Sequence, residues 1–196
     1  MATIKIEIQD QAVMAAFNRL IAAGDDISPI MRLIGERMAE STKQRFSDSR
    51  APDGSPWQPL ARSTYEGMVA GRKSNVTAKR GKLSALGAAR VMGRKPLIGE
   101  TGALSTTINY QLEGRNAVMI GTPMEYGFVH QFGGKKTYTI MPKNKQALAW
   151  PGGAHPVKKV VHPPLPKRAF LGVSADDSEQ ITQILRDAIN GAWRGS

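Results

Sequence analysis

The three histidines, His130, His155 and His162, are the side chains of this sequence best suited to metal binding or acid–base chemistry. Metal-binding histidines typically recur at a short, fixed spacing, for example four residues apart on one helix face, and these three show no such spacing. His155 and His162 each precede a proline, which favours an extended backbone. His130 lies within YGFVHQFGG (126–134), between aromatic residues and a glycine pair. The pattern favours a structural histidine over a metal ligand or a catalytic base.

The sequence also gives little support for nucleophilic catalysis or phosphate binding. It contains no cysteine and no Gly-x-Ser-x-Gly elbow, and its glycine-bearing stretches lack the Gly-Lys-Ser/Thr ending of a phosphate-binding loop. The acidic pairs Asp25-Asp26 and Asp176-Asp177 fall where we expect helix ends, and the second pair would favour the positive end of a helix dipole. We therefore predict a protein that is not an enzyme and that has no metal or cofactor site.

Basic residues dominate two stretches of the chain, which has a formal net charge of +11 at pH 7. Between 62 and 95 the only acid is Glu66, and between 126 and 175 there is no acid. Such a surface favours nucleic acid, an acidic protein or an anionic lipid, and a solvated basic face is the alternative. The candidate contacts to DNA or to an acidic partner are Arg72, Lys73, Lys79, Arg80, Lys82, Lys135, Lys136, Lys158 and Lys159. No apolar run approaches the length of a membrane span, so we expect a cytoplasmic protein without a membrane partner.

The elements that must position these residues begin with an N-terminal strand over 3–9, where isoleucine alternates with polar residues. A first helix over about 10–24 and a second helix over about 28–46 follow. The apolar stripe of the second helix is expected to comprise Ile30, Leu33, Ile34 and Met38. A turn-rich loop over 51–60 then carries Trp57 between prolines, as an anchor packed on the core.

Short antiparallel strands are expected in the middle of the chain. The predicted strands are 108–112 with 117–120 as a hairpin, 137–140, and 147–150 with 157–161 as a second hairpin. The predicted helices are a short one from Pro123 to the glycine pair at 133–134 and an amphipathic C-terminal one from about 174.

The expected fold is therefore α+β, with an N-terminal strand and two helices, central short antiparallel strands with long loops, and a C-terminal amphipathic helix. We expect a single domain over 1–196. A basic loop insertion at about 71–98 and a hairpin extension at about 143–162 would project from it.

Four segments occur in an order that resembles one family of phage proteins. They are DGSPWQPL (53–60), GETGAL (99–104), YGFVHQFGG (126–134) and PKRAFLG (166–172). Their order and spacing resemble the phage virion morphogenesis, or tail completion, family of Mu-like and related tailed phages. One departure is Ala169, which stands where the family favours a proline before the phenylalanine, and the basic insertion lies outside the motif set.

The resemblance implies a structural protein of the virion, located at the head–tail junction and assembled in the host cytoplasm. It implies a symmetric ring, with a hexamer as the favoured count, that contacts tail terminator or tail tube proteins and head-connector proteins. Genomic DNA in the channel is a further candidate partner. The alternative, favoured by the basic run at 62–95, is a nucleic-acid-binding accessory protein with no structural role in the virion.

The motif residues are expected to be structural or to lie in subunit contacts. They are Trp57, Leu60, Thr101, Gly102, Leu104, Tyr126, His130, Gln131, Phe132, Gly133, Gly134, Arg168, Phe170 and Leu171. His130 is expected to form a structural hydrogen bond, and Phe132 to pin the exit of its helix. Arg168 is expected to pair with an acid of the same subunit or of a neighbour.

Overall fold

The computed structural model describes residues 26–61, 94–99, 101–149 and 155–194, and also Ala15, Asn18 and Thr64. In these ranges the chain forms helices and short antiparallel strands, which confirms the α+β class. The elements are α2 (Ser28–Asp48), α5 (Ala103–Thr106), β1 (Asn109–Glu113), β2 (Ala117–Gly121), α6 (Tyr126–Phe132), β3 (Tyr138–Ile140), β4 (Val160–His162) and α7 (Ala175–Arg194). None of the helices in the described ranges is long and apolar enough to cross a membrane.

Several predicted features lie outside the described residues. They are the N-terminal strand, most of the first helix, and the basic residues Arg72, Lys73, Lys79, Arg80 and Lys82. Of the basic insertion, the structure describes only its last residues, from Arg94 onward.

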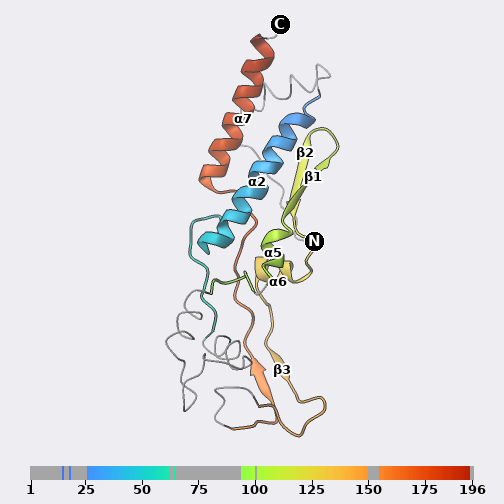
Figure 1. Ribbon diagram of the computed structural model, residues 1–196, viewed down its shortest axis with the longest axis vertical. Coiled ribbons are helices and arrows are strands. Elements are labelled where there is room, and N and C mark those ends of the chain that lie inside the picture. The colour runs from blue at the N-terminus through green and yellow to red at the C-terminus, as the bar shows by residue number, and fades with distance from the viewer. Residues whose placement is uncertain are drawn as a thin grey trace.

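Helix α2 is the central element of the body. Helix α7 lies along one side of it and the β1–β2 hairpin along another (Figure 1). Buried side chains of α2, among them Ile34, Met38 and Phe46, recur at helical spacing and so share one face. They form one hydrophobic cluster that also contains Ile120 of β2 and Leu185 of α7.

The apolar stripe of α2 differs from the predicted one at one position. Ile34 and Met38 are buried and Ile30 is partly buried, as predicted, but Leu33 is 51% exposed and Met31 is buried instead. Residues 31, 34 and 38 follow the helical period, whereas each single step along a helix turns a side chain by about 100°. Leu33 is therefore an apolar side chain on the outer face of the helix.

The predicted central hairpin is confirmed, because β1 and β2 pair antiparallel and Glu113 lies opposite Ala117. Its turn, 114–116, is one residue shorter than predicted, since Glu113 is the last residue of the strand. The hairpin approaches α2 closely at Gly35. A Cβ atom at that position would lie 2.6 Å from Cδ2 of Tyr110, so the approach requires glycine.

A second antiparallel ribbon, formed by β3 and β4, projects from the far end of the body (Figure 1). The sequence predicted instead that 147–150 pairs with 157–161. Of that pairing the structure keeps one bridge, between Leu148 and Val157, and the ladder at the base of the ribbon joins β3 to β4. The predicted pairing is therefore confirmed at this bridge, residues 150–154 lie outside the described residues, and the pairing of β3 with β4 was not predicted. Hydrophobic runs locate strands without specifying which residues face each other.

We expect the substitution Gly35→Ala to destabilise the protein, although alanine favours helix more than glycine does. The added Cβ would meet the ring of Tyr110 and Cγ2 of Val118 at less than 3 Å, and overpacking of this kind costs about 1–3 kcal/mol. Urea unfolding followed by circular dichroism measures the effect, with Lys43→Ala on the exposed face of α2 as the control. A Gly35→Ala protein as stable as the control would contradict the close packing.

Candidate functional site

The four motif segments converge around residues 165–172, which we term the clamped segment. This stretch is extended and belongs to neither described sheet. Its backbone N–H and carbonyl groups therefore need partners other than a neighbouring strand. Side chains from α2, from the loop 51–60 and from α6 provide them.

Gln131 of α6 binds the clamped segment through both ends of its amide group. Its Oε1 accepts hydrogen bonds from the backbone N–H groups of Phe170 and Leu171, each at 2.9 Å. Its Nε2 donates to the carbonyl oxygen of Leu171 at 2.8 Å. Because Gln131 is buried, these bonds are shielded from water. One side chain thus takes the place of a pairing strand.

Arg45 of α2 holds the same segment from another side. Its Nη1 donates to the carbonyl oxygens of Phe170 at 2.9 Å and Gly172 at 2.8 Å, and its Nη2 forms a buried ion pair with Asp177. Burial lowers the pKa of Arg45, and the Asp177 charge opposes that shift. Burial alone would raise the pKa of Asp177, but hydrogen bonds from serine groups and the charge of Arg45 hold it below its usual value. Both groups are therefore charged at neutral pH.

Asp177 also caps the N-terminus of α7. Ser174 Oγ accepts from the Asp177 N–H at 3.1 Å, and Asp177 Oδ2 accepts from the Ser174 N–H at 2.8 Å, a reciprocal capping box. The acidic pair was predicted at this helix start, but the partnership with Arg45 was not. A signal was present, because Arg45 follows Met38 and Thr42 on the buried stripe of α2 and a charge there needs a buried partner.

Trp57 joins the loop 51–60 to the clamped segment. Its Nε1 donates to the carbonyl oxygen of Ala169 at 2.8 Å. Its ring meets Phe46 edge-on with centroids 5.4 Å apart, and Phe46 lies 5.3 Å from Phe170. Trp57 is buried, so it anchors the loop on the core as expected.

Arg168 links the loop to α6. Its backbone N–H donates to the carbonyl oxygen of His130 at 2.8 Å, and its side chain donates to those of Gln58 at 2.8 Å and Pro59 at 3.2 Å. These bonds go to carbonyl groups, so the pairing of Arg168 with an acid stays a prediction. Its side chain is nevertheless buried and fixed within the subunit.

The chain leaves α6 through the glycine pair, at which the sequence predicted the helix to end, whereas Phe132, which was expected to pin this exit, faces solvent. Phe132 is half exposed and packs on Phe128, with ring centroids 4.8 Å apart. Gly133 has a φ of 81°, and the Gly134 N–H donates to the carbonyl oxygen of Leu165 at 2.8 Å. A Cβ on Gly134 would lie 2.7 Å from the nitrogen of Leu165. Glycine is needed there because two backbones come into contact.

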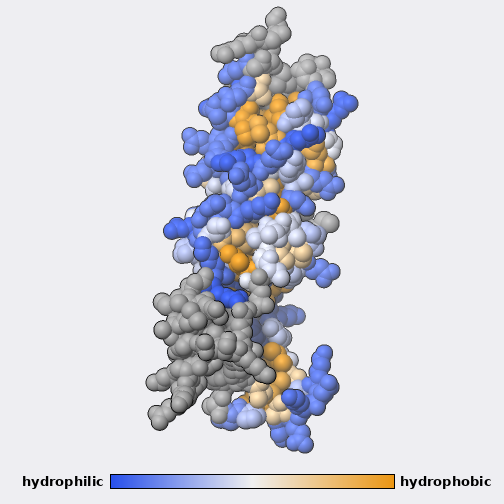
Figure 2. All heavy atoms as spheres, viewed as in Figure 1, coloured by the Kyte–Doolittle hydropathy of each residue, from blue (hydrophilic) through white to orange (hydrophobic). Residues whose placement is uncertain are grey.

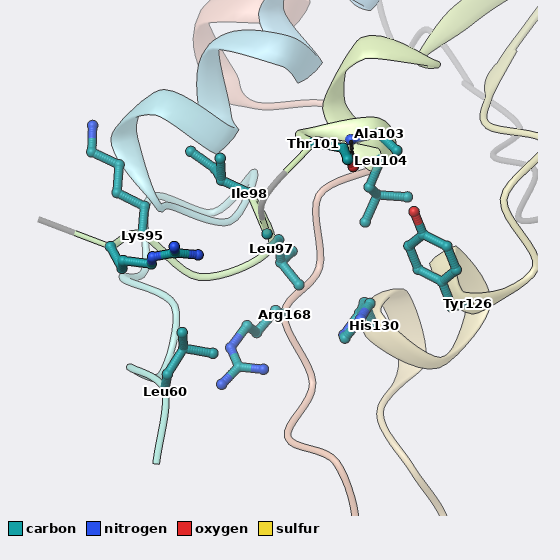
Figure 3. Close-up of a pocket in the computed structure, with 12 residues that line it drawn as sticks. Leu60, Lys95, Leu97, Ile98, Thr101, Ala103, Leu104, Tyr126, His130 and Arg168 are labelled. Atoms are coloured by element: carbon teal, nitrogen blue, oxygen red, sulfur yellow. Dashed lines mark hydrogen bonds between the residues drawn. The ribbon is translucent and has the colours of Figure 1, made fainter. Parts of the chain in front are cut away.

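A pocket of about 240 Å³ opens beside the clamped segment (Figure 3). All four motif segments contribute to its wall, as does the end of the basic insertion. The motif residues in the wall are Leu60, Thr101, Leu104, Tyr126, His130 and Arg168. Leu97 and Ile98 of the insertion add apolar surface. Gly102 begins α5 just behind this wall, with a φ of 63° that suits glycine.

His130 lies in the pocket wall with its ring edge-on to Tyr126, at a centroid distance of 6.2 Å. Its structural hydrogen bond is formed by its carbonyl group, to the backbone of Arg168. Its buried Nδ1 has no hydrogen-bond partner among the described residues. Burial lowers the pKa of His130, and the nearby Arg168 lowers it further, so the imidazole is neutral at pH 7.

The pocket wall is mostly apolar. No carboxylate is among the described residues that line it. Within the part of the chain that the structure describes, no group of three or more His, Asp or Glu side chains could hold a metal ion. Lys95, at the rim, donates from Nζ to the carbonyl oxygen of Ser47 at the end of α2. These features are those of a packed joint between segments. We use the term joint for the clamped segment together with the side chains that bind it, those of Arg45, Trp57 and Gln131.

The described basic residues singled out for DNA or an acidic partner do not line the pocket. Lys135 and Lys136 lie between α6 and β3, and Lys158 and Lys159 lie just before β4. All four side chains are exposed. The structure therefore separates a buried joint built by the motifs from an exposed basic ribbon.

The sequence pattern of the phage virion morphogenesis family matches residues 8–190, nearly the whole chain. The chain therefore belongs to the phage virion morphogenesis family, a structural and assembly family, and its role is in building the phage virion. No curated protein and no solved structure shows significant similarity to the chain.

We expect Gln131→Ala to reduce the free energy of unfolding by about 2–4 kcal/mol, because it leaves the buried groups of residues 170 and 171 without partners. Urea unfolding measures the loss. Gln44→Ala is the matched control, since Gln44 is exposed and bonds only to Asp48 one turn away; we expect a change within about 0.5 kcal/mol. Equal effects of the two substitutions would contradict the role assigned to Gln131.

We expect His130 to make the protein less stable as the pH falls below about 6.5, the usual pKa of histidine. The unfolded chain then takes up a proton on His130 that the folded protein resists, because the folded pKa is lowered. The contribution is full above that pH and is lost as the pH falls toward the folded pKa. Unfolding measured between pH 5 and 7.5 should show a flatter dependence in His130→Gln, whereas the exposed control His155→Gln should keep the wild-type slope. Parallel slopes for all three proteins would refute this account.

Proposed function

We propose that this chain is a tail completion or neck protein, which forms a ring at the head–tail junction and permits heads and tails to join. The observation that carries the proposal is the division of the molecule into a joint and a projecting ribbon. Gln131 and Arg45 hold the clamped segment in place, and the β3–β4 ribbon extends from it. Such a design positions a binding element without performing a reaction.

Membership of the virion morphogenesis family supports this proposal at the level of virion assembly. The proposed neighbours are tail terminator or tail tube proteins on one side and head-connector proteins on the other, with genomic DNA in the channel as a further contact. A ring built from identical subunits needs two different surfaces on each subunit. The helical body and the ribbon are two different surfaces of the subunit, which supports the proposal (Figure 1). Six subunits is the count that we propose.

A second candidate function is nucleic-acid binding without a structural role. The exposed lysines of the ribbon favour it, because lysines contact phosphates and release counterions. The two functions differ in what is measured. A nucleic-acid-binding protein would bind duplex DNA with an affinity that falls steeply with salt, and it would be absent from finished particles.

In cells infected by a phage that lacks this chain, we expect filled heads and separate tails to accumulate, without joined particles. The reason is that, on this proposal, heads and tails join only through the ring. Electron microscopy of the lysate and plaque counts after addition of the purified protein measure the effect, with Gln44→Ala protein as an active control. Normal joined particles in the absence of the chain would reject the proposed function.

A further inference from the structure

The β3–β4 ribbon, of which the structure describes residues 138–149 and 155–162, exposes apolar side chains to solvent; we term these described residues the arm. Tyr138 is 49% exposed, Met141 65% and Val161 60%. Figure 2 shows apolar surface at this end of the molecule, next to hydrophilic side chains. A two-stranded ribbon is only marginally stable by itself in water. In the described ranges, β3 and β4 pair with each other and with no third strand. The arm is therefore suited to being covered by another surface.

The charge of the arm limits what can cover it. Its lysines at 143, 145, 158 and 159 are all exposed, and the chain has no acid between residues 126 and 175. Two arms brought together would repel each other. A covering surface must therefore be acidic, and it must offer apolar side chains to meet Tyr138, Met141 and Val161.

The layer formed by α2 and α7 offers such a surface. Its exposed carboxylates are Glu36, Glu40 and Asp48 on α2 and Asp176, Glu179 and Asp187 on α7. Its exposed bases are Arg32, Arg37, Lys43 and Arg186, so carboxylates outnumber bases among the α2 and α7 side chains whose exposure the structure describes. Leu33, half exposed on α2, provides an apolar contact. This layer lies at the end of the molecule opposite the arm (Figure 1), so the arm cannot reach it within one subunit.

We propose that the arm of one subunit docks on the α2–α7 layer of a second copy of this chain. The arm and the layer are different surfaces, so the contact is head-to-tail and closes into a ring when the rotation between subunits is suitable. The proposal rests on the ring assembly proposed above and names the contact that forms it. Exposed ion pairs contribute little one by one, and the affinity comes from the arm's apolar side chains, with the charges selecting the partner surface.

Other occupants fit the arm less well. Duplex DNA would neutralise the lysines but leave Met141 and Val161 in water. An acidic partner of another sequence would fit the arm, but it would leave the acidic α2–α7 layer of this chain without a role. The experiment below separates these outcomes.

A charge exchange tests the docking. We expect Lys158→Glu with Lys159→Glu to raise the protein concentration needed for half-assembly by about tenfold or more, measured by mass photometry. Glu179→Lys with Asp187→Lys should have the same effect. A chain that carries all four substitutions restores complementary charges and should assemble close to the wild-type concentration. The control, Arg50→Glu with Arg115→Glu, makes the same charge change outside both surfaces and should assemble normally.

Carbodiimide cross-linking provides a second measurement with the native residues, since it joins lysine to carboxylate. We expect links between subunits from the arm lysines at 143–159 to carboxylates of α2 and α7, and weaker assembly of Val161→Ser with unchanged monomer unfolding. Two results would overturn the docking while leaving the proposed function intact. One is that the arm lysines are linked only to a protein of another sequence. The other is that the variant with Lys158→Glu and Lys159→Glu still forms rings at the wild-type concentration. A wild-type chain that joins heads to tails but never self-associates would also overturn it. A chain absent from particles would instead reject the proposed function.

Discussion

The burial of an extended segment without a strand partner is the constraint on which the rest of this structure depends. Residues 168–172 cross the middle of the molecule, and each backbone group left unbonded there would cost about 1–3 kcal/mol. Gln131, Arg45 and Trp57 satisfy these groups from three different segments. Because each donor must reach the same stretch, α2, the loop 51–60 and α6 are fixed relative to one another. The buried ion pair of Arg45 extends this arrangement to the start of α7.

The same joint sets the direction of the arm. The hydrogen bonds from the Arg168 N–H to the His130 carbonyl and from the Gly134 N–H to the Leu165 carbonyl align two segments of the chain antiparallel. These segments lead directly into β3 and β4. The base of the arm is therefore held by these backbone hydrogen bonds and by the β3–β4 ladder. Beyond the ladder, the described residues of the arm are joined by one bridge, between Leu148 and Val157. A firm base with an exposed, basic and partly apolar outer part is an arrangement suited to assembly. It also accounts for motif residues, such as Gln131 and Trp57, that bind other parts of the chain.

The role in virion assembly, which the family assigns, agrees with the chemistry of the site. The pocket at the joint is lined mainly by apolar side chains, and two cationic side chains in its wall, Lys95 and Arg168, donate to carbonyl oxygens. Its histidine is neutral because burial and Arg168 lower its pKa, and the described residues of the wall include no carboxylate beside it. These contacts stabilise one arrangement of the segments relative to one another. In a head-to-tail ring, that shape would decide the angle at which one subunit presents its arm to the next.

The sequence by itself determined the α+β class, the helices α2 and α7, the central hairpin and the acid-free basic stretch, because periodicity, turn residues and charge are local properties. It also located the residues of the joint through the order of the four motifs. Only the tertiary structure decided that Gln131, and not the ring of His130, makes the structural hydrogen bonds, and that Arg45 meets Asp177. It also decided the register that joins β3 to β4. Each of these depends on which segments distant in sequence lie side by side, and that is set by the packing of the whole chain.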